Sequence, residues 1–411
     1  MSYTELNLEL TEEQEALKES VGKFAMEVLR PASLTLDALT PEEVVAPGSV
    51  YWDAMKKMYS LGYHTVHIPD EFGGIGLDPL SHHIFFEELA RGSVGFTISL
   101  GVSLFGAFVA SMCPEDVVVE QIIKPFAACQ DASILGCWAI TEPNHGSDNL
   151  TPHHPHFHDP GIVQQVRAVK KGDRYILNGQ KSAWVSNGPI ATSALLFVNI
   201  EPSQGMAGGG ICVADLTQPG VSRGKPLNKI GQRELPQGEI FFDNAEVPAE
   251  LMFVDPESYE MMTEIVVSMA NMHMGAIFTG LAQAGYDLAL KYSTERVQAG
   301  KRLCDHEGVR SRLFHMFSRV ETARAFSRAA MTYNLNTTPP DSKFNLASKV
   351  YCTQAAYEVC HEAIQIFGGY GLTKEYPIEK LFRDARAGLI EDGSNDTLAV
   401  SGGGMILREV L

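Results

Sequence analysis

Apolar residues recur at helical spacing from about residue 10 to about residue 128. Their period of three to four is typical of helices with one buried face. The first such stripe consists of Leu17, Val21, Phe24, Ala25 and Val28. Thr11 and Gln14 precede it with the spacing of a capping box, and Pro31 predicts its end. Further helices are expected over about 52–61, 79–91 and 96–112.

The pattern changes twice more along the chain. From about 133 to 247, short β-branched and apolar runs such as 194–198 and 240–242 alternate with Gly, Pro and Asn clusters, which predicts strands. From about 258 the helical period returns, with long helices expected over 265–292 and 309–335. Helices, strands and helices in separate blocks indicate an α+β protein. We predict three domains, covering residues 1–128, 129–255 and 256–411.

Composition excludes several classes of protein. The net charge of −18 and the pI near 5.1 argue against general nucleic-acid binding. No run of about 18 consecutive apolar residues predicts a membrane span, and residues 1–10 do not have the pattern of a secretory signal. The seven cysteines are scattered and have no metal-binding spacing, so we expect reduced thiols in a cytoplasmic protein.

Candidate chemistry concentrates near the C-terminus. Gly368, Gly369 and Gly371 form a glycine-rich turn against which a flat or charged ligand could lie. Glu391 and Asp392 follow in a short polar loop, where a carboxylate is a candidate general base. For an acidic loop taken alone, a solvated turn is the commoner interpretation.

Several motifs together resemble the acyl-CoA dehydrogenase family. The segment Q-I-F-G-G-Y-G-L-T-K-E-Y-P-I-E-K-L-F-R-D-A-R at 365–386, followed by the acidic loop, resembles the family's C-terminal signature. T-E-P-N-H-G-S-D at 141–148 resembles its flavin loop, and E-E-L-A at 87–90 also fits. The resemblance covers nearly the whole chain. It implies an N-terminal helical domain, a middle β-barrel or sandwich domain and a C-terminal four-helix bundle.

The resemblance also implies a reaction. The family removes a proton from the α-carbon of an acyl-CoA thioester and passes a hydride from the β-carbon to the flavin of FAD. Alignment on Arg383-Asp384-Ala385 places the base at Asp392, where the family usually has Glu. Glu391 replaces the usual Tyr and is the substitute candidate for the base. Asp is shorter by one methylene, so the space vacated could admit a branched or alicyclic acyl group.

Individual contacts follow from the same resemblance. The expected cofactor-binding residues are Trp138, Ile140, Thr141, Gly146, Ser147, Trp184, Ser186, Arg296, Gln365, Gly368, Gly369, Ser394 and Asp396. The expected substrate-binding residues are Ser147, Asn271 and Gly393. His145 replaces a small residue of the family's flavin loop and could narrow the pocket. Some relatives carry the base on an earlier helix, but that place falls here at Ala270 and Asn271, neither of which is a base.

Partners are implied in the same way. In the family, the residue matching Arg296 reaches the flavin pyrophosphate of a neighbouring subunit, which implies an oligomer, most simply a tetramer. The implied electron acceptor is an electron-transfer flavoprotein. His153, His154, His156 and His158 could bind a divalent metal, but without acidic or Cys ligands they favour an exposed insertion, and we expect no metal site.

Two other functions remain open from the residues. Asp392-Gly393-Ser394-Asn395 also resembles the loop of nitroalkane oxidases, which would make this a flavin oxidase or monooxygenase that does not use CoA. Those enzymes pair the Asp with an arginine downstream in the loop, and here the next arginine is Arg408. The second alternative is a non-catalytic subunit that binds flavin or CoA.

Overall fold

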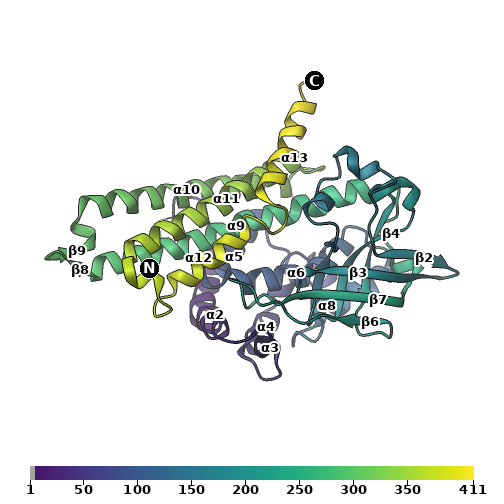
Figure 1. The fold of residues 1–411 in the computed structure, drawn as a ribbon, viewed down its shortest axis with the longest axis horizontal. Helices are drawn as coiled ribbons and strands as arrows, with labels where there is room; N and C mark the ends of the chain where they lie inside the picture. The colour runs from purple at the N-terminus through teal and green to yellow at the C-terminus, as the bar shows by residue number, and fades with distance from the viewer. Residues whose placement is uncertain (1–4) are drawn as a thin grey trace.

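The computed structural model describes residues 5–411, in which helices precede and follow a seven-stranded sheet (Figure 1). The predicted α+β class is confirmed. The N-terminal helices are α1 (Glu12–Phe24), α2 (Arg30–Asp37), α3 (Pro41–Val45), α4 (Val50–Ser60), α5 (Pro79–Gly92), α6 (Val94–Ala110), α7 (Asp116–Val118) and α8 (Lys124–Ala128). The helices expected over 52–61, 79–91 and 96–112 correspond to α4, α5 and α6.

The first helix begins as predicted and does not end as predicted. Thr11 and Gln14 form the capping box, each side chain bonding to the backbone N–H of the other residue. The prediction that Pro31 ends the helix is wrong, because Pro31 lies in the first turn of α2. A π-helical turn, Ala25–Leu29, joins the two helices, and the N–H of Arg30 donates to the Ala25 carbonyl. This wider pairing accommodates a residue that lacks an N–H and would crowd a regular turn.

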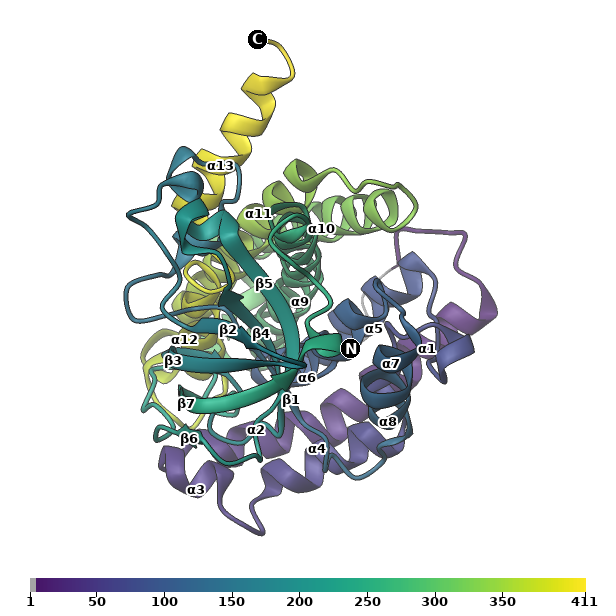
Figure 2. The ribbon, with the colours of Figure 1, turned by 90° about the vertical axis from the view of Figure 1, so that its right-hand side faces the viewer.

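The middle strands form one curled sheet around its own apolar core (Figure 2). The strands are β1 (Gly136–Ala139), β2 (Arg167–Lys171), β3 (Arg174–Ser186), β4 (Ser193–Asn199), β5 (Gly209–Asp215), β6 (Val221–Arg223) and β7 (Gln237–Pro248). Their order is β1-β4-β2-β3-β7-β6, and β5 pairs with β4. β1 runs parallel to β4, while the long β3–β7 pair is antiparallel. Strand β1 also packs against α6, which joins the sheet to the N-terminal helices.

The C-terminal helices pack around one long central helix. They are α9 (Tyr259–Glu295), α10 (Glu307–Leu335), α11 (Ser342–Phe367), α12 (Ile378–Gly388) and α13 (Asn395–Arg408). α9 is apolar enough to cross a membrane, but 94% of its apolar window is buried inside the fold, as in the core helix of a globular protein. α13 extends away from the bundle and carries the C-terminus (Figure 1). The domain boundaries at 128/129 and 255/256 stay predictions.

Close packing of α9 against α5 produces a stability prediction. A Cβ added at Gly280 would lie 2.1 Å from the Glu87 carbonyl oxygen, so the two helices must separate to admit a methyl group. Gly280→Ala should destabilise the fold by about 1–3 kcal/mol through overpacking, visible as a lower Tm. Gly402→Ala, on the open face of α13 with no atom near its added Cβ, is the control. It should be neutral or slightly stabilising. Equal melting of both variants would contradict the packing argument.

Candidate active site

The acidic loop between α12 and α13 is held in one conformation by its own backbone. Asp392 and Gly393 both have positive φ angles, 52° and 94°. Asp tolerates the left-handed region better than most residues, and glycine enters it freely. The Ser394 hydroxyl caps α13 by accepting from the Thr397 N–H. These turns aim the Asp392 side chain away from both helices and into the interior.

Lys349 of α11 holds the acidic loop in place through hydrogen bonds. Its fully buried ammonium donates to the Gly393 carbonyl oxygen at 2.6 Å and to Asn395 Oδ1 at 2.9 Å. Burial lowers the pKa of Lys349 to about 8, against the opposing effect of the Asp392 and Glu391 carboxylates. The sequence analysis missed this residue. Its signal in the sequence was a lysine between the apolar residues Leu346 and Val350.

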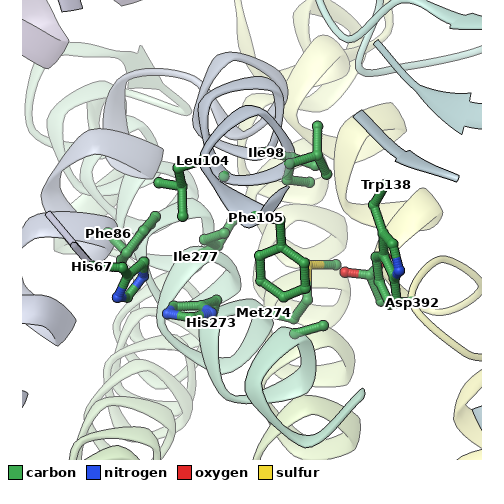
Figure 3. Close-up of a pocket in the computed structure, with 13 residues that line it drawn as sticks. His67, Phe86, Ile98, Leu104, Phe105, Trp138, His273, Met274, Ile277 and Asp392 are labelled. Atoms are coloured by element: carbon green, nitrogen blue, oxygen red, sulfur yellow. The ribbon is translucent and has the colours of Figure 1, made fainter. Parts of the chain in front are cut away.

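Asp392 lines a small apolar cavity between α5, α6, α9 and β1, with a volume of about 30 Å³ (Figure 3). Figure 3 shows Asp392 and Trp138 at one end, His67 and Phe86 at the other, and Phe105 and His273 between them. The full lining is His67, Phe86, Ile98, Gly101, Val102, Leu104, Phe105, Trp138, Ala270, His273, Met274, Ile277 and Asp392. Burial raises the pKa of Asp392 to about 6, with Lys349 opposing the rise. A carboxylate with such a pKa is largely ionised near neutral pH and can accept a proton.

Glu391 lies next to Asp392 but does not line the cavity. Its Oε1 accepts from Gln232 Nε2 at 2.6 Å, which ties it to the middle domain. Burial, followed by the Asp392 charge, raises the pKa of Glu391 to about 7. Of the two predicted catalytic carboxylates, only Asp392 faces the cavity.

The first predicted flavin loop meets the acidic loop directly. The backbone N–H of Ser394 donates to Ser147 Oγ at 3.0 Å. Trp138 lines the cavity, and its buried Nε1–H has no partner among residues 5–411. Ile140 is buried, and its carbonyl accepts from the buried Lys181 ammonium at 3.2 Å. The structure therefore brings Trp138, Ser147 and the acidic loop together.

Other residues of the predicted flavin loop make hydrogen bonds within the middle domain. Gly146 donates its N–H to Asp148 Oδ1 at 2.6 Å, and the Thr141 carbonyl accepts from the Ser182 N–H at 2.9 Å. His145 does not line the Asp392 cavity, and the expectation that it narrows the flavin pocket stays a prediction. Its Nδ1 lies 2.7 Å from Asp148 Oδ2 and its Nε2 3.0 Å from the Val163 carbonyl oxygen, because loop hydrogen bonds turn the ring away.

Trp184 and Ser186 lie near the end of β3. The Trp184 side chain is 58% exposed, so it does not belong to the sheet core. Ser186 Oγ accepts from Gln237 Nε2 at 3.0 Å. An exposed indole beside a fixed hydroxyl suits contact with a planar ligand lying against the sheet.

A second group of predicted cofactor-binding residues lies at the C-terminal end of α9, away from the Asp392 cavity. Arg296, Gln365, Gly368 and Gly369 line a groove of about 590 Å³ at the far end of α9, together with Tyr370. The Arg296 guanidinium lies over the Tyr370 ring, 5.5 Å from its centroid. Nothing lies within 4 Å of a Cβ built on either glycine, so the groove is open for a ligand. At a rise of about 1.5 Å per residue, the end of α9 is about 40 Å from the cavity-lining Ala270. Within one chain, this groove and the Asp392 cavity are separate.

The remaining predicted site residues are Asn271, Gly393 and Asp396, and none of them lines the Asp392 cavity. Asn271 is buried beside Ala270, but it does not line the cavity, and its Nδ2 donates to the Val267 carbonyl. Gly393 is buried under Leu398 and Leu150 and presents its carbonyl to Lys349. Asp396 is exposed on α13.

The histidine-rich segment pairs with the start of α9. His153 Nε2 lies 2.9 Å from Glu264 Oε2, and His158 Nε2 lies 3.3 Å from Glu260 Oε2. Across the described part of the chain, no group of three or more His, Cys, Asp or Glu side chains is arranged to hold a metal ion.

Comparison with known proteins identifies the class that this fold and site define. Three family profiles match in order: acyl-CoA dehydrogenase N-terminal domain at residues 11–117, middle domain at 137–245 and C-terminal domain at 262–401. The chain belongs to the acyl-CoA dehydrogenase family, which confirms the resemblance. It is therefore an FAD-dependent oxidoreductase.

Particular relatives extend over almost the full chain. The mitochondrial short-chain specific acyl-CoA dehydrogenase of Rattus norvegicus is 29% identical over 405 residues, covering 98% of this chain and 92% of its own. Butyryl-CoA dehydrogenase from Megasphaera elsdenii is similar in structure, with a TM-score of 0.86, 27% identity and coverage of 99% and 100%. A structure titled as the electron transferring flavoprotein of Acidaminococcus fermentans has a TM-score of 0.87, 28% identity and coverage of 98% and 100%.

The hydrogen bonds from Lys349 to the acidic loop predict that this residue limits opening of the loop. Lys349→Met removes two charge-assisted hydrogen bonds, each worth about 1.5–3 kcal/mol, and should open the loop more often. Amide hydrogen exchange in a peptide covering 389–398 should accelerate at least about tenfold. Lys374→Met, at an exposed position, is the matched control. Unchanged exchange in Lys349→Met would mean that the loop is held by other contacts.

Proposed function

We propose that this protein oxidises a short acyl-CoA thioester and that Asp392 removes the α-proton. One observation carries the proposal: Asp392 is the carboxylate that lines the apolar cavity, and its burial raises its pKa to about 6. A base of this pKa is ionised at neutral pH and still holds a proton strongly enough to abstract one. Glu391, bonded to Gln232, tunes the charge around the loop from outside the cavity.

The backbone of the same loop supplies the second requirement. Removing the α-proton places negative charge on the thioester oxygen, which needs hydrogen-bond donors. Asp392 lines the cavity, and we propose its backbone N–H as one such donor. Lys349 keeps that N–H in place by holding the next carbonyl. The apolar lining excludes water, which strengthens both interactions.

FAD supplies the hydride acceptor when it is bound. Trp138 and Ser147 at the acidic loop, with Trp184 and Ser186 on β3, are the residues that would hold its ring. Trp138 offers an unpartnered buried N–H, and Trp184 an exposed indole. Arg296 suits a pyrophosphate because its planar guanidinium can donate two hydrogen bonds. Its groove is about 40 Å from the cavity, so we propose an oligomer, most simply a tetramer, in which a second copy supplies that groove.

The cavity volume favours a small acyl group. About 30 Å³ holds one or two water-sized groups, so side chains of the lining must move to admit even a four-carbon acyl group. The space left by the shorter acid therefore suits a compact branch near the α-carbon better than an alicyclic ring. We propose a short, straight or branched chain. Similarity to a structure titled as an electron transferring flavoprotein supports such a flavoprotein as the electron acceptor. The free cysteines support a reducing compartment such as the cytoplasm.

Asp392→Asn tests the base. The variant keeps the shape of the side chain and cannot accept the α-proton, so anaerobic flavin reduction by butyryl-CoA should slow by about 10²–10⁴-fold. Flavin content, measured from absorbance, should be retained. Glu391→Gln should slow reduction far less, because Glu391 faces Gln232. Full-rate reduction by Asp392→Asn, or an equal loss in Glu391→Gln, would overturn the assignment.

The pH dependence follows from the raised pKa of Asp392. The carboxylate form is the active one, so the rate of flavin reduction is high above about pH 6 and falls as pH drops through that value. At pH 5 about a tenth of the plateau rate should remain. Stopped-flow reduction between pH 5 and 9 measures the profile. Removing the nearby positive charge in Lys349→Met should move the midpoint upward, since Lys349 lowers the pKa of Asp392.

A further inference from the structure

The end of the cavity farthest from Asp392 contains polar groups that the proposed reaction does not use. His67, in the connection between α4 and α5, lines this end, and His273, in α9, lies next to it on the side toward Phe105, with the two ring centroids 4.4 Å apart (Figure 3). Their side chains are 8% and 6% exposed. The Nε2 atom of each ring is buried and has no hydrogen-bond partner within residues 5–411. Two unsatisfied buried nitrogens at one end of an otherwise apolar cavity cost stability unless a ligand pairs with them.

The surroundings keep both rings neutral. His67 stacks on His82 with centroids 4.3 Å apart and lies 4.4 Å from His273. Burial lowers the pKa of His273 to about 3 and that of His67 well below its usual value. No carboxylate lines this end of the cavity to stabilise an imidazolium. The two rings therefore act as hydrogen-bonding groups without charge.

The hydrogen-bonding direction of each ring depends on its tautomer. In a neutral imidazole one ring nitrogen donates and the other accepts, so Nε2 does one or the other. A ligand group that can both donate and accept pairs with Nε2 in either tautomer. A group that only accepts pairs with it in one tautomer alone.

We propose, resting on the acyl-CoA dehydrogenase function above, that the acyl group of the substrate carries a hydroxyl at its far end, held between His67 and His273. A hydroxyl can pair with each Nε2 atom in either tautomer, because it can both donate and accept. A ketone only accepts, so it pairs with Nε2 only where that nitrogen carries the proton. A carboxylate has the same restriction and would bring a negative charge into a cavity whose lining contains no cation. A methyl group leaves both nitrogens unpaired. A site built to bond a hydroxyl discriminates against the analogue without it.

Matched thioesters test this inference in the purified holoenzyme. The probes are 4-hydroxybutyryl-CoA, butyryl-CoA and succinyl-CoA, with kcat/KM for flavin reduction as the measurement. The hydroxyl compound should exceed butyryl-CoA by about 10–100-fold, corresponding to about 1–3 kcal/mol for the unpaired groups. In His273→Leu this ratio should fall to near one, and His273→Gln, which restores an acceptor, should recover part of it. Met272→Leu, buried on the same helix but outside the cavity lining, should leave the ratio unchanged.

The outcomes separate the two proposals. If butyryl-CoA reduces the flavin as well as or better than 4-hydroxybutyryl-CoA, the hydroxyl inference is overturned and the proposed function stands. A preference for succinyl-CoA also overturns it. If none of the thioesters reduces the flavin of the wild-type protein, both proposals fall. Should the His273 variants not fold, the wild-type ratio alone still decides.

Discussion

The contact between the Lys349 ammonium and the acidic loop is the interaction on which the site depends. A buried ammonium loses its hydration, and it must regain hydrogen bonds inside the protein. It does so by bonding to the Gly393 carbonyl and to Asn395, on either side of Ser394. The same cation lowers the pKa of Asp392 against the effect of burial. One side chain thus fixes the shape of the loop and keeps its carboxylate usable near neutral pH.

Two adjacent carboxylates are distinguished by what faces them. Glu391 meets Gln232 at its tip and lies near Lys229, whereas Asp392 projects into an apolar cavity. Burial, followed by repulsion from Asp392, raises the pKa of Glu391 to about 7. Position within the loop, rather than residue type, decides which acid can serve as a base.

The sequence predicted the fold class and much of the loop, because periodicity and motif spacing are local properties. The capping box at Thr11, the helices of the bundle and the placement of Asp392 in an irregular loop all came from neighbouring residues. Lys349, Gln232, His67 and His273 were missed, since their importance arises from contacts between segments far apart in the chain. The prediction that Pro31 ends the first helix was wrong because the π-helical turn before it accommodates the proline and lets the chain continue as α2.

The polar end of the cavity also constrains the length of the acyl group. For the proposed hydroxyl-bearing substrate, Asp392 must reach the α-carbon while His67, at the other end of the cavity, and the adjacent His273 meet the terminal hydroxyl (Figure 3). A cavity of about 30 Å³ leaves little room between these ends. A chain too short would leave the imidazole nitrogens unpaired, and a chain too long would have to displace Phe105 or Met274. The same few side chains would therefore select both the length of the acyl chain and its terminal group. A poor fit of the terminal group would shift the α-carbon away from the base.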